Sequence, residues 1–315
     1  MNTPKVSICI PTYKQVEYLY RSLESIQAQT FKNYEVIITD DTPDDSVKKA
    51  VEMFDFQGKL KYLKNLPRLG SPKNFNEAIL HAKGDYIKVM MHDDWFMDES
   101  SLEKFIALLD NNPDADFGFS SSFHWTKDPE KRWTLRASAN QLNNLRRDPK
   151  SLFFGNVIGM PSVTIFRKTV EERFDPNLRC IVDLEFYIRV LQSNKNFAFC
   201  HEPLVCVVEG LEHQVSTTCC GNNKELDLFE YLYVFKKNQD SKLLTKHHAD
   251  FLGNLFVKYK VKSYQEVREL GVQFSPQVEY WLKLIILKFN LKALRNSIVS
   301  SLKRLKLRFW KKQII

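Results

Sequence analysis

The stretch Val6-Ser-Ile-Cys-Ile-Pro-Thr-Tyr13 decides how this 315-residue chain folds. Up to Ile10 it combines small and β-branched side chains without a charge, which is typical of a short strand covered on both faces. Pro11 has no N–H to give to a neighbouring strand, so we expect the strand to run from Lys5 to Ile10 and to stop there. Thr12 and Tyr13 would then follow its carboxyl end.

The rest of the first 120 residues repeats this pattern of short apolar runs separated by helical periodicity. Strands are predicted at 35–39, 60–63 and 86–91, and further along the chain at 116–120, 162–166 and 196–199. Strands that alternate with helices form a mostly parallel sheet with helices on both faces, so the predicted fold class is α/β. The second run ends on Asp40-Asp41 and the last on His92-Asp93-Asp94. Because ligands bind at the carboxyl ends of such strands, we expect an acidic site at this edge of the sheet.

Two common phosphate-binding motifs are missing from this edge. No GxGxxG follows the first strand, which excludes a Rossmann dinucleotide site, and no GxxxxGK[ST] is present, which excludes a P-loop. A sugar nucleotidyltransferase is disfavoured as well, because no glycine-rich, arginine-containing loop follows the first strand.

The net charge of +8 belongs to the C-terminal tail. Ten bases follow Glu279, the last acid, and the preceding residues carry 36 bases and 38 acids. This excludes a broadly basic body that binds nucleic acid. Apolar residues recur at three- and four-residue spacing through 281–312, so we expect a basic amphipathic helix that lies on an anionic membrane surface. Docking of its apolar stripe on the protein's own body, or a homo-oligomer formed through it, is the alternative.

The remaining composition is that of a globular cytoplasmic protein. No apolar segment has the length of a membrane span, and the N-terminus lacks the apolar core of a secretory signal. Six cysteines without a CxxC pair argue against zinc and favour a reducing cytosol. A break in the pattern at 215–225 divides the chain into a predicted α/β domain, 1–220, and a helical C-terminal region, 221–315. We therefore expect a cytoplasmic protein held at the inner face of the cell membrane by its tail.

The pair Asp93-Asp94 calls for an explanation, because adjacent carboxylates after a buried strand repel each other unless a cation or strong donors lie nearby. Capping of the following helix by Asp94 or Asp98 is the simpler interpretation, but it needs one aspartate and leaves the pair unexplained. A site for a hard cation that also grips a diphosphate explains both residues.

Several motifs, in this order and spacing, resemble the family 2 glycosyltransferases. They are Val6-Ser-Ile-Cys-Ile-Pro-Thr-Tyr13, Leu23-Glu-Ser-Ile-Gln-Ala-Gln-Thr-Phe31, Tyr34-Glu-Val-Ile-Ile-Thr-Asp-Asp41, Asn74-Phe-Asn-Glu-Ala-Ile79, Ala82-Lys-Gly-Asp-Tyr-Ile87 and His92-Asp-Asp94. Each motif alone is weak, but the set is specific. The resemblance covers about residues 4 to 215. It implies a GT-A fold, a Rossmann-like sheet flanked by helices, and an inverting enzyme that uses a nucleotide-sugar donor.

The resemblance also implies a nucleotide-sugar site along the acidic edge. Asp41 matches the carboxylate that accepts the N3–H of a pyrimidine, a donor that uracil and thymine carry and cytosine lacks. This implies a UDP- or dTDP-sugar. Asp93 matches the residue that hydrogen-bonds the ribose. The implied nucleotide-sugar residues are Pro11, Thr12, Tyr13, Asp41, Arg68, Lys73 and Asp93.

A divalent cation, Mn²⁺ or Mg²⁺, is the implied cofactor. Asp94 matches the residue that coordinates it, and His213 lies where some relatives place a further ligand to the metal or diphosphate. The chain has His92 where many relatives have aspartate, so the DxD pattern is incomplete.

Inverting transfer also needs a carboxylate that takes the proton of the acceptor hydroxyl. In the segment Val182-Asp-Leu-Glu-Phe-Tyr-Ile-Arg189, which resembles the family's element, Asp183 has the base position and Val182 replaces the usual acid before it. Glu185 is the competing carboxylate, and helix capping is the alternative for Asp183. Acceptor-binding residues implied by the resemblance are Gly159, Pro161 and Ser162, and the candidates for stacking on a sugar are Trp95, Trp125 and Trp133.

The expected function is transfer of a hexose or similar sugar from a UDP- or dTDP-sugar to a hydroxyl of a glycan or lipid-linked glycan in surface polysaccharide synthesis. The alternative is a non-catalytic GT-A subunit that binds nucleotide or glycan at the membrane. The departures at His92 and Val182 favour this alternative.

Overall fold

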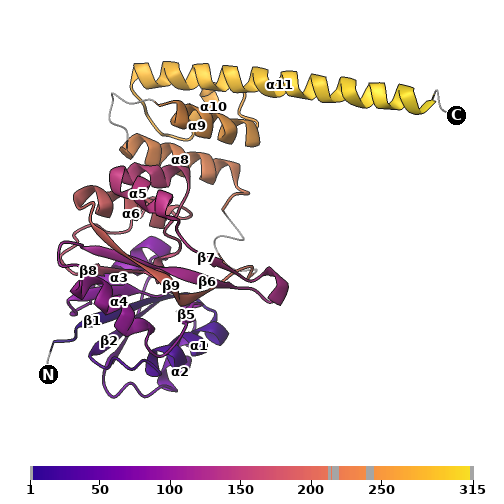
Figure 1. Ribbon diagram of the computed structural model, residues 1–315. Coiled ribbons are helices and arrows are strands. Elements are labelled where there is room, and N and C mark those ends of the chain that lie inside the picture. The colour runs from indigo at the N-terminus through magenta and orange to yellow at the C-terminus, as the bar shows by residue number, and fades with distance from the viewer. Residues whose placement is uncertain (1–2, 212–213, 215–219, 239–244, 313–315) are drawn as a thin grey trace. The chain divides into compact units, whose positions relative to one another are not determined.

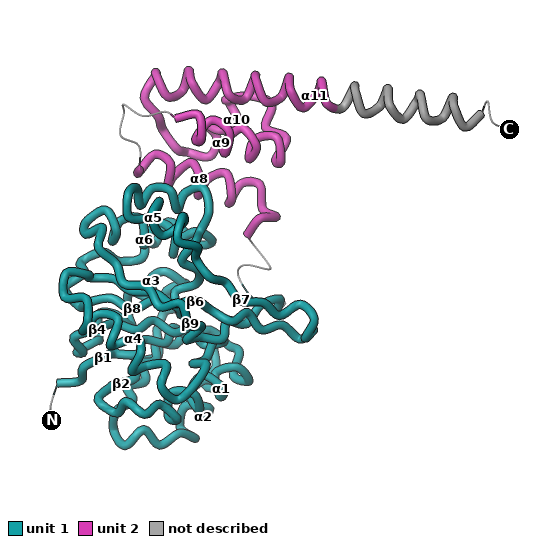
Figure 2. Tube along the Cα trace, in the orientation of Figure 1, with its two compact units in different colours: residues 1–218 teal, residues 219–315 magenta. Residues whose placement is uncertain are grey.

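A computed structural model describes residues 3–211, 214, 220–238 and 245–312, with side chains up to Asn296. The chain divides into two units, residues 1–218 and 219–315 (Figure 2). His213, an implied ligand of the metal or diphosphate, lies outside the described residues.

The first part of unit 1 alternates strands and helices, as predicted. In chain order it contains β1 (Val6–Thr12), α1 (Val16–Gln27), β2 (Tyr34–Asp40), α2 (Ser46–Glu52), β3 (Leu60–Lys64), α3 (Ser71–Leu80) and β4 (Tyr86–Val89) (Figure 1). All neighbouring pairs among these strands are parallel. Every residue of β1 is buried, because helices cover both faces of the sheet, and α1 turns its apolar stripe, including Leu19, Leu23 and Ile26, into the core.

The predicted end of the first strand at Ile10 is wrong, because β1 continues through Pro11 to Thr12. The pairing of β1 with β4 stops at Cys9, whereas its pairing with β2 continues to Thr12. Pro11 therefore lies where one side of β1 has no neighbouring strand, and its missing N–H breaks no ladder.

The second part of unit 1 extends the same sheet. Its elements are β5 (Trp95–Phe96), α4 (Ser101–Asp110), β6 (Phe117–Trp125), η1 (Pro129–Lys131), β7 (Trp133–Leu135), α5 (Ala139–Arg147), η2 (Pro149–Phe154), η3 (Pro161–Val163), β8 (Thr164–Arg167), α6 (Val182–Ser193) and β9 (Phe197–Val208). The strand order is β3-β2-β1-β4-β8-β6-β9-β5, with β7 paired to β6.

The strand ends next to the candidate residues lie along one edge of this sheet. The short strand β8 is antiparallel to both β4 and β6, and β9 is parallel to β6. It follows that β6 and β9 run in the direction of β1 to β4. Their carboxyl ends and the start of β8 therefore lie along the same edge, with β3, β2 and β1 on one side of β4 and β8, β6, β9 and β5 on the other.

Unit 2 contains α8 (Lys224–Asn238), α9 (Lys246–Lys258), α10 (Tyr264–Glu269) and α11 (Pro276–Lys312). One face of α11 packs into the unit through Leu282, Ile285 and Phe289, and Gly253 of α9 leaves room for the Phe289 ring, which a Cβ there would strike. Over the described residues, no helix combines the length and the hydropathy needed to cross a bilayer.

The cysteines depart from the free thiols expected in a reducing cytosol. Cys180 and Cys220 each belong to a disulfide, whereas Cys9, Cys200 and Cys206 are free thiols. Structural disulfides are rare in a reducing compartment, in contrast to the reducing cytosol that the sequence favours.

Candidate active site

Asp41 follows β2 and is buried against the loop that follows β3. Its Oδ1 accepts hydrogen bonds from Asn65 Nδ2 and from the backbone N of Leu69, both at 2.9 Å. Its Oδ2 accepts one, from the backbone N of Gly70 at 2.8 Å. A carboxylate offers about four acceptor positions. Asp41, which is 4% exposed, therefore keeps acceptor capacity at Oδ2 for one further donor.

Two asparagines that sequence reasoning missed fix this corner of the site. Asn65 also donates to Asn74 Oδ1 at 2.8 Å, and Asn74 Nδ2 donates to the carbonyl oxygen of Thr12 at 3.1 Å. The same carbonyl accepts from the backbone N of Asp41 at 3.0 Å. Thr12 is therefore a buried part of the framework, as is Pro11, and the network joins the ends of β1, β2 and β3 to α3.

Asp40, the other half of the predicted pair, has a structural role. It is fully buried and accepts from Tyr62 OH at 2.7 Å and from Lys64 Nζ at 2.9 Å. The backbone N of Thr42 donates to it at 2.8 Å. Both carboxylate oxygens of Asp40 therefore have hydrogen-bond partners within the protein.

Tyr13 and Arg68 lie together beside Asp41. The Arg68 guanidinium lies 4.0 Å from the centre of the Tyr13 ring, and Lys14 Nζ lies 5.1 Å from it. This stacking holds a cation at the end of the edge formed by β1 and β3. Lys73 is exposed in the first turn of α3.

Asp93 and Asp94 follow β4 and are both buried. Asp93 Oδ2 accepts from Gln214 Nε2 at 2.8 Å. Asp94 Oδ1 accepts from the backbone N of Val208 at 3.0 Å. Within the part of the chain that the structure describes, Asp94 Oδ2 is buried without a partner.

Burial and the charge of Asp93 raise the pKa of Asp94 well above its usual range. Hard cations such as Mg²⁺ and Mn²⁺ prefer carboxylate oxygens as ligands. Asp94 Oδ2, which is buried without a partner beside the carboxylate of Asp93, is suited to such a cation. Both ring nitrogens of His92 are likewise buried without a partner among the described residues. No group of three His, Cys, Asp or Glu side chains able to hold a metal occurs in those residues.

Lys88, in the middle of β4, was not among the predicted site residues. A lysine inside an apolar strand is unusual and could have marked it as a candidate. It is 0% exposed, and its Nζ donates to the carbonyl oxygens of Val89, at 2.9 Å, and of Ser162. Burial lowers the pKa of Lys88 to about 7, and the charge of Asp94 opposes this shift. Ser162 Oγ accepts from the backbone N of Met91 at 2.8 Å, so η3 is fastened to the end of β4.

Asp183 lies in the first turn of α6 and is joined to the predicted acceptor-side loop. Asn156 Nδ2 donates to Asp183 Oδ2 at 3.0 Å and to the carbonyl oxygen of Gly159 at 3.1 Å. Tyr187 of α6 donates to that carbonyl at 3.2 Å. The residue at the N-cap of α6 is Ile181, so Asp183 does not cap the helix.

Gly159 has a local reason to be glycine. Its φ of +104° is one that other residues rarely adopt, and a Cβ there would lie 3.3 Å from Leu135 Cδ2. Pro161 and Ser162 are buried in η3 just beyond it. The loop thus connects Asp183 with the end of β4, where Ser162 accepts from Met91.

Glu185, the competing carboxylate, is engaged elsewhere. It is buried, and Arg189 grips it with two hydrogen bonds, from Nε at 2.7 Å and from a terminal nitrogen at 2.9 Å. Its burial and this bidentate ion pair make Glu185 a structural carboxylate rather than a base within reach of an acceptor hydroxyl.

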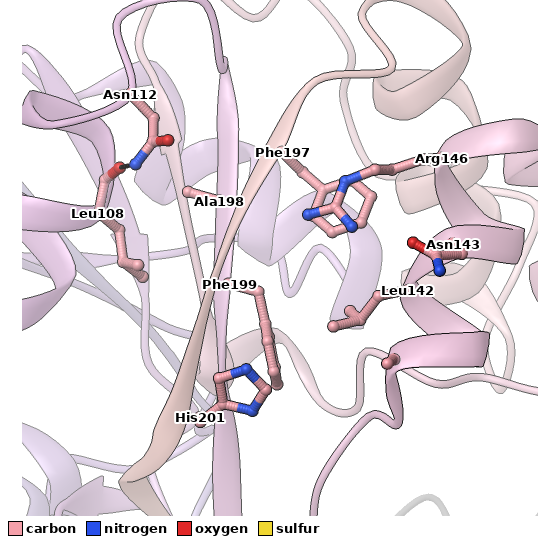
Figure 3. Close-up of a pocket in the computed structure, with 10 residues that line it drawn as sticks. Leu108, Asn112, Leu142, Asn143, Arg146, Phe197, Ala198, Phe199 and His201 are labelled. Atoms are coloured by element: carbon pink, nitrogen blue, oxygen red, sulfur yellow. Dashed lines mark hydrogen bonds between the residues drawn. The ribbon is translucent and has the colours of Figure 1, made fainter.

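A pocket of about 370 Å³ lies away from these residues, between α5 and the start of β9 (Figure 3). Arg146 lies 4.6 Å from the centre of the Phe197 ring there, and Asn143, Phe199 and His201 complete the lining. Phe197 pairs with Phe117 at the start of β6, so the pocket opens at the opposite edge of the sheet.

Comparison with known proteins identifies the family. The family model described as Glycosyl transferase family 2 matches residues 7–174. An uncharacterized glycosyltransferase of Methanocaldococcus jannaschii is 29% identical over 295 residues, which cover 91% of this chain and 94% of that protein.

Solved structures resemble the chain in fold. The crystal structure of S. aureus TarS 1-349 in complex with UDP-GlcNAc has a TM-score of 0.61 at 18% identity and covers 88% of this chain and 78% of that one. Mannosyltransferase PcManGT from Pyrobaculum calidifontis, solved with GDP-Man and Mn²⁺, has a TM-score of 0.51 at 14% identity and covers 98% and 81%. The fold is GT-A, as predicted. Because the family model spans more than half of its length, this chain belongs to glycosyl transferase family 2.

Proposed function

We propose that the chain is an inverting hexosyltransferase that moves a sugar from a UDP- or dTDP-sugar to a hydroxyl of a glycan or lipid-linked glycan. Family membership supports sugar transfer, and a structural neighbour was solved with UDP-GlcNAc. The observation that carries the proposal is the line of contacts from the end of β4, where Met91 donates to Ser162, through the adjoining loop to Asp183. It supports a leaving-group site and a candidate base on one edge of the sheet.

In this proposal Tyr13, Arg68, Lys73 and Asp41 bind the nucleotide. The free acceptor position of Asp41 takes the N3–H of the base, and Asp93 takes a ribose hydroxyl. Asp94 would hold Mn²⁺ or Mg²⁺, and the cation would stabilise the negative charge on the leaving diphosphate.

Asp183 acts on the acceptor. Its carboxylate takes the proton of the acceptor hydroxyl as that oxygen attacks the anomeric carbon from the face opposite the diphosphate, so the configuration inverts. Asn156 holds Oδ2 and thereby orients the carboxylate. Glu185 is unsuited to this role because it is buried in its pair with Arg189.

Release of UDP or dTDP from a panel of nucleotide-sugars, with Mn²⁺ and in EDTA, tests the reaction. Turnover of at least one donor, lost in Asp183→Asn with nucleotide binding retained, is the expected result. The incomplete DxD pattern and Val182 favour the second candidate, a non-catalytic GT-A subunit. Nucleotide binding without turnover of any donor would establish that candidate instead.

We further propose that α11 holds the protein on the anionic inner face of the cell membrane, in surface polysaccharide synthesis. Leu284, Leu287, Leu291 and Leu294 line one face of the helix and are 46–59% exposed. Lys288 and Lys292 on the same stretch are also exposed, and no acid follows Glu279. Apolar side chains flanked by bases suit a surface of anionic lipid.

Cosedimentation with phosphatidylglycerol vesicles tests whether α11 binds anionic membrane. Truncation after Asn296 removes bases while keeping the buried residues of α11, whereas truncation after Glu279 would also remove Leu282 and Phe289 from the core. The variant cut after Asn296, combined with Leu287→Asn and Leu291→Asn, should lose vesicle binding and keep nucleotide binding. Unchanged vesicle binding would refute the membrane role.

A further inference from the structure

Four side chains form a cationic–aromatic cluster at the edge of the sheet that the proposed mechanism leaves unused. Arg21 of α1 lies 5.0 Å from the centre of the Trp95 ring and 5.7 Å from that of Trp125. Arg132 lies 5.1 Å from the Trp125 ring. The two tryptophan rings meet edge to face with centres 6.1 Å apart. Their inner surfaces pack on Tyr18, Val208 and Leu211.

This cluster is built around the carboxyl end of β9, next to Asp94. Trp95 pairs with Cys206, and Trp125 pairs with Val208, whose backbone N donates to Asp94 Oδ1 at 3.0 Å. In the strand order, β6, β9 and β5 lie on the other side of β4 from β1, β2 and β3. The two indoles therefore lie across β4 from Asp41, on the side opposite the proposed nucleotide residues, and Arg21 reaches them from α1, which follows β1.

Both arginines keep donors available. Arg21 is exposed, and among the described residues neither Arg21 nor Arg132 forms an ion pair with a carboxylate. Arg132 donates from Nε to the carbonyl oxygen of Thr126 at 3.1 Å. Stacking on an indole covers the face of a guanidinium and leaves its in-plane N–H groups free to bind an anion.

Both guanidiniums lie against the Trp125 ring, 5.7 Å and 5.1 Å from its centre. Burial and the charge of Asp94 raise the pKa of the Cys206 thiol beside them, and the charges of Arg21 and Arg132 lower it. Two guanidiniums on one ring repel each other, and an anion bound between them relieves that repulsion. Partly exposed indole rings beside them offer the flat apolar surface on which a sugar ring packs.

We propose that Arg21, Arg132, Trp95 and Trp125 form an acceptor subsite that binds an acidic saccharide, with the carboxylate or phosphate on the arginines and the sugar ring against the indoles. The inference rests on the proposed function, because it takes the acceptor side of a sugar-transfer site as given. It narrows the acceptor to a glycan that carries negative charge near the reacting hydroxyl.

Tryptophan fluorescence of the full chain with saturating UDP and Mn²⁺ tests this directly. The probes are methyl β-D-glucuronide, methyl β-D-glucoside and methyl β-D-glucoside 6-phosphate. The first two differ in charge, and the third distinguishes a phosphate from a carboxylate. Wild-type protein should bind one of the two acidic probes at least about tenfold more tightly than the neutral one, as a charge-assisted hydrogen bond implies.

The variants Arg21→Gln and Arg132→Gln should reduce this preference to near unity, whereas Arg136→Gln, an exposed arginine outside the cluster, should keep it. Equal affinity for charged and neutral probes, or no binding of any probe, would overturn the inference. Weaker binding of UDP in Arg21→Gln than in Arg136→Gln would assign the cluster to the donor and also overturn it. UDP binding by wild-type protein is measured first, so a failure of the proposed function is seen separately.

Discussion

The amide of Asn156 donates a 3.0 Å hydrogen bond to the carboxylate of Asp183. The same amide donates to the carbonyl of Gly159, and η3 beyond it is fastened to β4 through Ser162. The candidate base and the acidic pair are thus parts of one connected structure. A carboxylate held in this way is oriented before a substrate arrives, which is how positioned groups lower a barrier.

Asp183→Asn should abolish most of the transfer. Loss of a general base costs a factor of about 10² to 10⁴ in kcat. The amide keeps the size of the side chain and an oxygen for Asn156 to bind, so folding and nucleotide affinity should be unchanged. Initial rates of UDP release with acceptor, beside UDP affinity by calorimetry, check this. Full activity in Asp183→Asn would remove the residue from the mechanism.

Glu185→Gln should affect stability rather than chemistry. The change leaves Arg189 without its carboxylate in a half-buried position, and breaking a buried pair in this way costs about 2–4 kcal/mol of unfolding free energy. Urea denaturation measures this cost, and kcat per folded molecule should stay close to wild type. A fall in kcat as large as that of Asp183→Asn, with unchanged stability, would reverse the two assignments.

Asp94→Asn should stabilise the protein when metal is absent. It removes the repulsion between two buried carboxylates and keeps an oxygen for the backbone N of Val208. We expect Asp94→Asn to have a higher Tm than wild type in EDTA at pH 8. The gain in unfolding free energy should be about 1 kcal/mol. The rise in Tm that Mn²⁺ causes in the presence of UDP should disappear. A lower Tm in EDTA, or an undiminished response to Mn²⁺, would contradict the site.

Lys88→Met should change how stability depends on pH. The pKa of Lys88 is about 7 in the folded protein, and it returns to about 10.4 on unfolding. Between these values the unfolded chain binds one more proton, so Lys88 makes stability rise with pH by up to about 1.4 kcal/mol per pH unit. The stability of wild type relative to Lys88→Met should therefore increase from pH 7 to pH 9 in EDTA. Parallel pH curves would show that Lys88 is not buried as a neutral amine.

The sequence predicted the first half of the sheet well and the second half poorly. β1, β2 and β4 are mostly apolar runs buried on both faces, so composition marks them. β6 was predicted only as far as Ser120, because its buried Ser120, Ser121 and Ser122 resemble a loop. β9 continues well beyond the predicted 196–199, and its length depends on pairing with β6, which no local pattern reveals.

The residues of the candidate site also fall into those that the sequence could identify and those that it could not. Residues that belong to contiguous motifs, such as Asp41 and Asp94, could be picked out from the sequence. Asn156 and Gln214 could not, because each acts on a residue that is distant in sequence. The cluster of Arg21 and Arg132 likewise forms only when α1 meets the ends of β6 and β9.

The most direct test of the account compares nucleoside diphosphates that differ at the atom Asp41 is proposed to bind. Isothermal titration calorimetry with UDP, dTDP, CDP and GDP, all in Mn²⁺, makes the comparison. The account predicts that UDP or dTDP binds and that CDP binds at least about a hundredfold more weakly, since cytosine would set two acceptors against each other. Equal affinity for UDP and CDP, or binding of GDP alone, would contradict it.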